Sequence, residues 1–442
     1  MAKTGTSTSK ATDKIKDLKQ RIVFTLIILV VYRIGTYLPI PGIDPAVFRQ
    51  ISSQNESGLL GMLNVFSGGA LGRMTIFALN VMPYITSSII MQLLSSTTPS
   101  LGELKKSGEA GRKKMSQYTK YLTIFLALFQ GYGIAVGLEN LSIDAGAAVL
   151  YSGTFFRLTT VVTLVGSTMF LLWLGDQITA RGIGNGISLI IFAGIVAELP
   201  SALISTIELG KTGVYSTFFI LLIILLVISL IAIIVFFERS FRNIIVQYPK
   251  RNMGNKMANV EGSNLPLKIN TSGVIPPIFA SALLLFPITV ISFGNTTNPS
   301  AFASFVSTNL AHGKPLFVIL YSALIIFFSF FYTAVVFNSK ETSDYLKKAG
   351  GFIPGIRPGE QTANHLDYVL ARITVLGAAY LTFICIIPEF IIAKYSLPFY
   401  LGGTSLLIVV NVAMDTISQV QSYVISNRYE SVIKKNRIRI RA

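Results

Sequence analysis

Long apolar stretches separated by polar ones dominate the hydrophobic pattern of the chain. Ten of them recur, and each is close to the ~20 residues that an α-helix needs to cross a bilayer. Their approximate bounds are 22–40, 74–94, 121–138, 154–174, 187–207, 214–237, 272–292, 315–337, 372–392 and 399–420. The pattern therefore predicts ten transmembrane helices, with both termini on the same side of the membrane.

One apolar stretch does not fit this scheme. LLGMLNVFSGGALGRMTIFALNVMPYITSSIIMQLL, residues 59–94, is interrupted at Ser67-Gly68-Gly69, at Gly72 and at Arg73. We expect 74–94 to be one span, which leaves 59–72 too short to cross the membrane and too apolar for an ordinary loop. Taken alone, these residues favour a helix lying in the membrane interface over a segment that folds back into the protein.

Composition excludes a soluble protein. The chain has 442 residues, of which 52% are hydrophobic and 13% charged, whereas soluble domains carry about 25% charged residues. The first apolar run is not a typical secretory signal, because 21 residues precede it and no small-residue cleavage pattern follows in YRIGTYLPIPG. The single cysteine, Cys385, excludes an intramolecular disulfide. We therefore expect an all-α polytopic membrane protein whose first helix is retained.

Lys and Arg are distributed very unevenly between the two predicted sides. The two tails and four loop regions hold 30 of the 37 basic residues, and these segments are 1–21, 95–120, 175–186, 238–271, 338–372 and 423–442. By the positive-inside rule both tails and these loops are cytoplasmic. All six segments fall on the same side when the chain crosses the membrane ten times, which supports the count of ten spans.

Two of the predicted cytoplasmic loops, 238–271 and 338–371, are long enough to be functional or disordered. The first carries Arg242, Lys250 and Arg251. The second contains KKAGGFIPGIRPGEQ, in which glycines and prolines surround Arg357. This punctuation predicts stiff turns that present one cation at their tip. The alternative is a solvated basic loop that only obeys the positive-inside rule.

Residues suited to catalysis are sparse. The two histidines, His312 and His365, lie in predicted loops, and neither an HExxH helix nor a phosphate-binding loop occurs. RGIGNGIS resembles part of a dinucleotide fingerprint, but no strand precedes it, so we expect a turn into the fifth span. An intramembrane serine protease needs both Ser and His within its spans, and neither histidine lies in a predicted span. We expect no enzyme activity, no cofactor and no metal site.

Transport classes remain: a secondary transporter of a small solute, or a channel for something larger. Transporter sites are marked by ionisable residues near the membrane midplane, and the predicted spans contain few. Asp415 is the main exception, and the polar residues that follow it place it near the cytoplasmic interface. Arg33 and Glu389 lie near outer ends of spans, where snorkelling to the interface suffices. The channel is favoured, with the transporter as the alternative.

Six motifs then resemble the SecY/Sec61-alpha family of protein-translocating channels, in order, from about residue 15 to the C-terminal tail. They are LNVMPYITSSIIMQLL, KKSGEAGRKKMSQYTKYLT, LGDQITARGIGNGISLIIFAGI, LPLKINTSGVIPPIFASALLLFP, GIRPGEQTA and GGTSLLIVV. The resemblance implies two inverted five-helix halves, residues 22–207 and 208–422, around a central pore. It also implies a lateral gate toward lipid, between the helices that begin near Met74, Tyr121, Thr271 and Pro315.

The resemblance assigns candidate site residues in three groups. The stretch 59–72 matches a plug helix that closes the resting pore, with the residues Leu60, Leu63, Asn64, Phe66, Ser67, Gly68, Gly69 and Leu71. The pore ring is carried over to Val81, Ile85, Ile187, Ile191, Ile278 and Ile408, with Val81 in place of the more usual isoleucine. Cytoplasmic docking is carried over to Arg242, Lys250, Arg251 and Arg357.

The family also implies partners and a location. The membrane subunits SecE and SecG, the SecA ATPase, the translating ribosome and membrane lipid are the expected partners, with no specific nucleic-acid site beyond ribosome docking. The substrates are unfolded chains bearing a signal sequence or a transmembrane segment. The expected location is the bacterial cytoplasmic membrane, with residues 1–21 and 423–442 as cytoplasmic tails.

Overall fold

The computed structural model describes residues 6–45, 47–48, 64, 67–139, 142–143, 146–147, 149–212, 215–248, 252–253, 256–257, 263–292, 314–395 and 402–440. Long helices dominate this part of the chain, and a helix overlaps each of the ten predicted spans. The helices are α1 (Thr6–Gly35), α4 (Met82–Thr97), α5 (Pro99–Lys106), α6 (Glu109–Glu139), α7 (Thr154–Arg181), α8 (Gly186–Lys211), α9 (Thr217–Glu238), α10 (Ile275–Ser292), α12 (Pro315–Val336), α13 (Ser339–Lys348), α14 (Glu360–Tyr395) and α15 (Gly403–Ile440).

Length and hydropathy alone identify fewer spans than the apolar runs do. Seven helices of the described chain are long and apolar enough to cross a membrane. They are Glu109–Glu139, Thr154–Arg181, Gly186–Glu208, Thr217–Glu238, Pro315–Lys348, Glu360–Ile392 and Gly403–Ile425. These spans confirm a polytopic membrane protein of mainly helical structure.

The predicted bounds of the second span are wrong at its start. Residues 67–81 form turns, and α4 begins only at Met82. Pro83 explains the late start, because proline lacks a backbone N–H and is favoured in the first helical turn but disrupts a helix interior. The backbone before α4 pairs elsewhere: Ile76 N donates to Leu38 O (2.9 Å) and Ile40 N to Met74 O (3.1 Å). Hydrogen bonds to the chain after α1 thus replace those of a longer helix.

The cytoplasmic loops expected at 238–271 and 338–371 contain regular structure. Within the first, β3 (Phe241–Val246) pairs antiparallel with β6 (Ser263–Lys268), from Phe241 opposite Lys268 to Val246 opposite Ser263. Within the second, α13 precedes the glycine-rich turn and α14 begins at Glu360 rather than near 372. Two further short strand pairs occur in the described chain, β1 (Ser142–Ile143) with β2 (Gly146–Ala147) and β4 (Asn252–Met253) with β5 (Lys256–Met257), besides isolated bridges.

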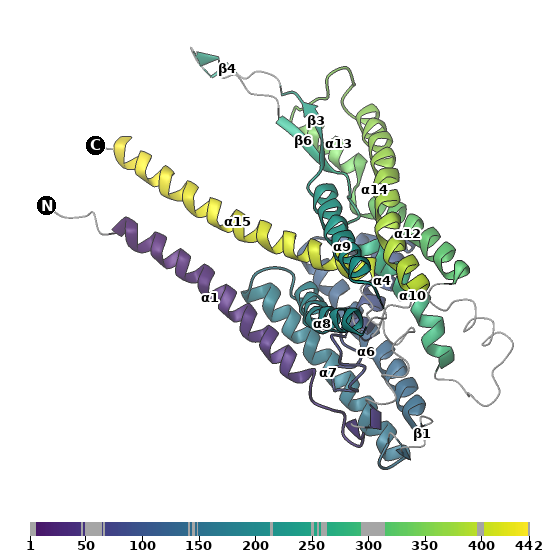
Figure 1. Ribbon diagram of the computed structural model, residues 1–442. Helices are drawn as coiled ribbons and strands as arrows, with labels where there is room; N and C mark the ends of the chain where they lie inside the picture. Colours follow the sequence, from purple (N-terminus) through teal and green to yellow (C-terminus); the bar gives the residue numbers. More distant parts are fainter. Residues whose placement is uncertain are drawn as a thin grey trace.

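Figure 1 shows α1 and α15 running side by side toward the two chain ends. A hydrogen bond joins them, from the Tyr423 hydroxyl to Asp17 Oδ2 at 2.6 Å. Both predicted tails are therefore largely helical, because α1 begins at Thr6 and α15 continues to Ile440. The hairpin β3–β6 and α13 lie together at one end of the molecule (Figure 1).

Two large hydrophobic clusters form the interior. One joins α1, the segment 67–81, α7, α8 and α15, with Tyr32, Leu171 and Ile190 fully buried. The other joins α9, α10, α12, α14 and α15 and includes Ile89 of α4. The first cluster brings together the candidate site residues.

Candidate functional site

The six aliphatic residues of the predicted ring come together in space. Val81 precedes α4, and the others lie on α4, α8, α10 and α15. Val81, Ile191 and Ile408 are core members of the first hydrophobic cluster, with 1%, 7% and 2% of their surfaces exposed. Ile85, Ile187 and Ile278 are partly buried and pack against that cluster. Four elements far apart in the sequence therefore supply one apolar contact region.

The described part of the predicted plug is buried beside this region. Leu60, Leu63 and Phe66 lie outside the described residues, whereas Asn64, Ser67, Gly68, Gly69 and Leu71 lie within them. Ser67 is 2% exposed, and Ala70, a member of the first cluster, is 0% exposed. The segment is non-helical from residue 67 to 81, and its Ala70 belongs to the hydrophobic cluster that also contains Val81, Ile191 and Ile408.

Local hydrogen bonds hold this segment in a tight turn. The Ser67 hydroxyl donates to Asn64 O (2.9 Å) and accepts from Leu71 N (3.0 Å). Gly72 N donates to Asn64 Oδ1 at 2.6 Å, and Gly69 N to Asn64 O at 2.8 Å. Such internal partners satisfy backbone groups that no regular helix or sheet pairs.

Two arginines converge on the carbonyl oxygen of Gly68. Arg33 Nη1 of α1 and Arg73 Nη2 each donate to this oxygen at 2.9 Å. Both guanidinium groups lie over the ring of Tyr37, at 4.9 and 4.5 Å from its centroid. Arg73 Nη2 also lies 3.7 Å from Glu198 Oε1 of α8. We call Arg33, Tyr37, Arg73 and Glu198 the arginine clasp.

The prediction that Arg33 and Glu389 only extend toward the membrane interface is wrong. Arg33 points to the turn at Gly68 and is partly buried, so its charge is used inside the protein. Glu389 of α14 is 6% exposed and lies within the bundle. Tertiary contacts determine the surroundings of Arg33 and Glu389. The place of a residue within an apolar run does not tell which neighbouring helices its side chain contacts.

Gly68 also brings two backbones into close contact. A Cβ atom added to Gly68 would lie 2.8 Å from Gly194 Cα of α8. Gly68 has φ +65°, a conformation that glycine adopts readily and other residues adopt at a cost. The turn therefore fits against α8 only with glycine at this position.

The predicted gate helices are in contact on one side of the bundle. Ile89 of α4 belongs to the same cluster as Phe279 and Ala282 of α10, and Ile85 and Leu93 pack against it. The side chains named here are apolar, so packing holds this part of the seam together. Helices α4 and α10 belong to the two different predicted halves.

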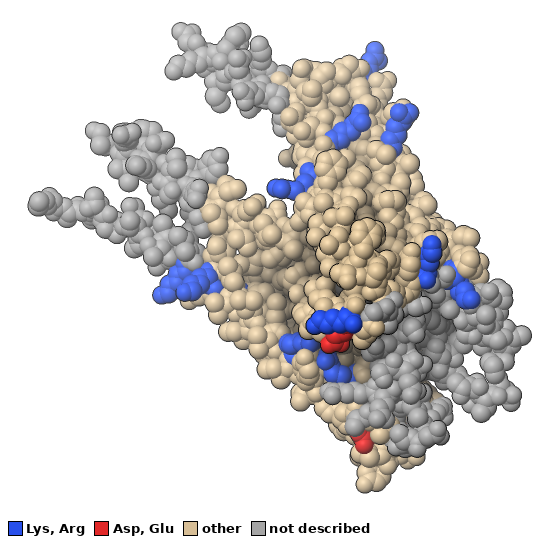
Figure 2. Space-filling view, viewed as in Figure 1, with Lys and Arg blue, Asp and Glu red and all other residues tan. Residues whose placement is uncertain are grey.

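The predicted docking cations are partly described. Arg242 on β3 and Arg357 before α14 are exposed, whereas Lys250 and Arg251 lie outside the described residues. Gln247, the residue after β3, and Phe352 exchange two backbone hydrogen bonds, at 2.8 and 2.9 Å, which join the end of the strand to the glycine-rich turn. Figure 2 shows Lys and Arg side chains over this end of the molecule.

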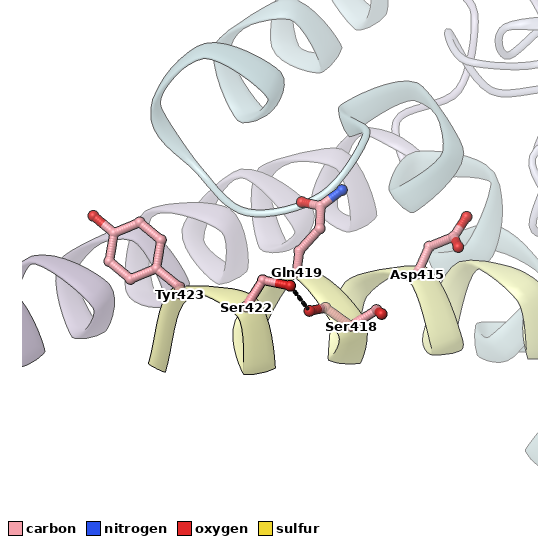
Figure 3. Close-up of a pocket in the computed structure, with 5 residues that line it drawn as sticks. All are labelled: Asp415, Ser418, Gln419, Ser422 and Tyr423. Carbon is pink, nitrogen blue, oxygen red and sulfur yellow. Dashed lines mark hydrogen bonds between the residues drawn. The ribbon is translucent and has the colours of Figure 1, made fainter. Parts of the chain in front are cut away.

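A polar pocket on α15 was not predicted. It has a volume of about 690 Å³ and opens to solvent, and Figure 3 shows its lining. The lining residues are Asp415, Ser418, Gln419, Ser422 and Tyr423. Their spacing of three and four residues is the sequence signal that identifies one helical face.

Two contacts place this pocket against neighbouring elements. Gly184 N, in the turn between α7 and α8, donates to Gln419 Oε1 at 2.9 Å. The Tyr423 hydroxyl and the Arg21 guanidinium hydrogen-bond to Asp17, and they hold the pKa of this carboxyl below its usual value. Asp17 lies in the predicted N-terminal tail, outside the spans.

Metal-binding clusters are not found in the described chain, since no three His, Cys, Asp or Glu side chains gather there closely enough to hold an ion. The site instead offers an apolar contact region, a clasped turn beside it and a polar face on α15.

Comparisons with known proteins agree on one family. The profile of the SecY family matches residues 75–417. The chain is 53% identical to the protein translocase subunit SecY of Rickettsia conorii over 423 residues, which cover 96% of this chain and 97% of the relative. It is 52% identical to the protein translocase subunit SecY of Escherichia coli K12, over 95% of this chain and 94% of the relative.

Solved structures show the same fold at low sequence identity. One described as the structure of a protein conducting channel has TM-score 0.66 and 18% identity, with 93% of each chain covered. Another, Sec61 in the canine ribosome-channel complex from the endoplasmic reticulum, has TM-score 0.65 and 18% identity, again with 93% of each chain covered. A third, whose description concerns the plug domain of SecY and the closed state of the channel, has TM-score 0.60, 19% identity and the same coverage.

Proposed function

The chain belongs to the SecY family, and from this premise we propose that it forms a protein-conducting channel. It passes unfolded secretory polypeptides across the bacterial cytoplasmic membrane and releases transmembrane segments sideways into lipid. The observation that carries this proposal is the meeting of six aliphatic side chains from both predicted halves in one cluster.

Such a ring suits a seal for a polypeptide channel. A narrow apolar constriction excludes water and ions by dewetting. Aliphatic side chains also form no hydrogen bonds that would retain a passing peptide. The same residues therefore block small ions at rest and leave the chain free to slide when the ring widens.

The clasped turn at residues 67–81 supports the plug assignment. Non-spanning backbone at membrane depth is tolerated where protein encloses it or where it lines a wet cavity. This segment is enclosed, and the Gly68 carbonyl is held by two charged donors. We propose that the plug, from residue 59 to 72, closes the outer side of the ring and that the arginine clasp holds it there.

The apolar seam between α4 and α10 supports the lateral gate. Its apolar contacts are weak individually, so a bound apolar signal helix can replace them with similar packing. We propose that the two halves separate along this seam when a signal sequence binds.

The driving force comes from partners, since the sequence contains no phosphate-binding loop. We propose that the SecA motor and the translating ribosome dock at Arg242, Lys250, Arg251 and Arg357, and that SecE and SecG complete the membrane complex. Similar structures described as the canine ribosome-channel complex and as a yeast Ssh1 complex bound to the 80S ribosome support a ribosome partner.

We propose that both tails are cytoplasmic. The uneven distribution of Lys and Arg supports this orientation. The contact between Asp17 of α1 and Tyr423 of α15 also requires these two helix ends to lie on the same side.

Reconstitution tests the proposed function. The full chain with SecE and SecG is placed in proteoliposomes, and SecA, ATP and one radiolabelled precursor are added. We expect ATP-dependent protection of the precursor from protease, and no protection when SecA is omitted. Protection at background level in well-formed proteoliposomes would contradict the channel.

Depletion in cells separates the channel from a solute transporter. Accumulation of several unrelated secretory precursors is expected on depletion. A fall in the uptake of one solute, with precursor processing unchanged, would favour the transporter instead.

Deletion of residues 60–71 tests the plug separately. We expect increased ion conductance of the resting channel in planar bilayers, with export retained. A transient increase also supports the assignment, because neighbouring sequence can partly replace the plug. Unchanged resting conductance would contradict it.

A further inference from the structure

The hairpin of β3 and β6 joins α9 to the gate helix α10, and its two ends meet at a buried polar contact. Glu238 is the last residue of α9, and Asn270 follows the end of β6 by two residues. Asn270 Nδ2 donates to Glu238 Oε1 at 2.6 Å, and both residues are buried. This contact therefore lies between the loop that bears Arg242 and the start of α10.

Further hydrogen bonds fix Asn270 at the start of the gate helix. Its amide also donates to Gly273 O at 3.1 Å, and the Ser272 hydroxyl donates to its Oδ1 at 3.1 Å. Helix α10 begins at Ile275, two residues after Gly273, and Ile278 of the predicted ring lies in its first turn. The position of Asn270 thus determines where the gate helix begins.

Helix α14 packs closely on the same contact. A Cβ atom added to Gly377 would lie 3.0 Å from Ile269 O. One turn later, the ring of Tyr380 stacks on Phe237, with the ring centroids 4.4 Å apart. Tyr380 is 5% exposed, and its hydroxyl has no hydrogen-bond partner among the described residues. It lies close enough to Glu238 for the two groups to interact electrostatically. A second buried donor is therefore near the Glu238 carboxyl group.

The place of Glu238 is unfavourable for a carboxyl group that lacks a donor. The C-terminus of a helix carries partial negative charge, which disfavours an anion there. Burial also removes the water that would otherwise solvate the group. Glu238 therefore needs a hydrogen-bond donor wherever α10 lies. In this structure Asn270 is that donor.

We infer that Glu238 is a two-position latch for the gate helix: Asn270 holds its carboxyl group while α10 packs on α4, and the Tyr380 hydroxyl takes over when α10 moves away. The inference rests on the proposed lateral gate and adds the residues that position α10 within its own half. Asn270 belongs to the chain that leads into α10, whereas Glu238 and Tyr380 lie on α9 and α14. The exchange of donors lets α10 move without leaving a buried acceptor unpaired, so the closed and the open position are both stable.

Export of two precursors tests the latch, one with an intact signal and one with a defective signal. Each channel variant is reconstituted with SecE and SecG, SecA and ATP are added, and the ratio of defective to intact export is measured. A variant that only folds poorly lowers both exports and leaves their ratio unchanged. Thr382→Val is the matched control, because the Thr382 hydroxyl lies on α14 but donates to Ala378 O of the same helix.

The variants are expected to change this ratio in opposite directions. Asn270→Leu should raise it several-fold, because the donor of the closed position is lost while Tyr380 still serves the open one. Tyr380→Phe should lower it several-fold, because only the donor of the open position is lost. Thr382→Val should match the unsubstituted channel. Glu238→Leu removes the acceptor, so adding Tyr380→Phe to it should cause no further change.

The results that would overturn the latch differ from those that would overturn the channel. Co-purification of SecE shows which variants assemble, and Asn270→Ser, whose side chain is too short to reach the carboxyl group, replaces Asn270→Leu if that variant does not. An unchanged ratio in the assembled Asn270 variant or in Tyr380→Phe would remove the latch and leave the channel. A further fall when Tyr380→Phe is added to Glu238→Leu would also remove it. Absence of export of the intact precursor by the unsubstituted channel would contradict the proposed function itself.

Discussion

Two glycine-rich turns, residues 67–81 and 350–359, illustrate two uses of the same residue type. In the first, Gly68 approaches the backbone of Gly194, and a Cβ atom there would lie 2.8 Å from Gly194 Cα. In the second, Gly355 and Gly359 have φ +82° and +110°, and no atom lies within 4 Å of an added Cβ. Gly68 thus provides close packing in the buried turn, whereas Gly355 and Gly359 provide only an unusual dihedral angle in the exposed one.

Their arginines differ in the same way. Arg33 and Arg73 turn inward and donate to Gly68 O. Arg357 is exposed, while its own carbonyl accepts from the Thr362 hydroxyl at 2.9 Å and the Ser343 hydroxyl donates to Gly359 O at 2.6 Å. The buried turn uses charge to hold itself closed, and the exposed turn is held by neutral groups and leaves its charge available for a partner.

The largest effect is expected from reversing the exposed charge. Arg357→Glu should abolish precursor export, because the proposed docking cation becomes an anion, while membrane insertion and SecE binding survive. Stability should change by less than about 0.5 kcal/mol, as is usual for exposed substitutions. Export in vesicles and co-purification of SecE provide the measurements. Arg357→Lys keeps the charge and serves as the control; normal export by a well-expressed Arg357→Glu channel would sink the docking role.

The next effect is expected from Gly68→Ala. The added methyl group meets Gly194, and an L-residue at φ +65° costs roughly 1 to 2 kcal/mol. Both effects destabilise the closed turn, so resting ion conductance in planar bilayers should increase. Gly355→Ala is the matched control, because it has the dihedral cost without the contact. Equal conductance of the two variants would show that the close approach does not hold the plug.

A smaller effect is expected from a substitution in the predicted aliphatic ring. Ile408→Asn should remove roughly 1.5 to 3 kcal/mol of apolar burial and wet the constriction. In the proposed mechanism a signal sequence opens the channel by binding the open state better, so a weaker closed state lets poorer signals suffice. Export of one signal-defective precursor should therefore rise in Ile408→Asn but not in Ile408→Leu. Equal export by wild type and both variants would remove Ile408 from the ring.

The smallest effect is expected from opening one side of the arginine clasp. Arg33→Met removes one of the two donors to Gly68 O, and Arg73 still holds the same oxygen. A hydrogen bond to a charged group contributes about 1.5 to 3 kcal/mol, and the remaining donor reduces the loss. Signal-defective export should increase less than in Ile408→Asn, and Arg33→Lys should restore part of the closure. A higher resting ion conductance in Arg33→Met than in Gly68→Ala would contradict this order of effects, because the hydrogen bond from Arg33 would then matter more than the close approach of Gly68 to Gly194.

Much of the helical architecture could be predicted from the sequence, because lipid requires long apolar helices whatever their neighbours are. A helix overlaps each predicted apolar run, and the motif NVMPYI contained a signal for the late start of α4. Pro83 favours a first helical turn, yet the apolar residues before it suggested a longer span. Hydropathy does not distinguish backbone that continues a helix from backbone that pairs with a distant segment.

The sequence by itself determined where the chain is apolar, where it is basic and where glycine and proline permit turns, because these properties depend on residues close together in the chain. Only the tertiary structure decided that Arg33 holds Gly68, that Gly68 fits against Gly194, and that Gln419 meets Gly184. Each of these contacts joins residues far apart in the sequence. Their geometry depends on how whole helices pack, and no local pattern contains that information.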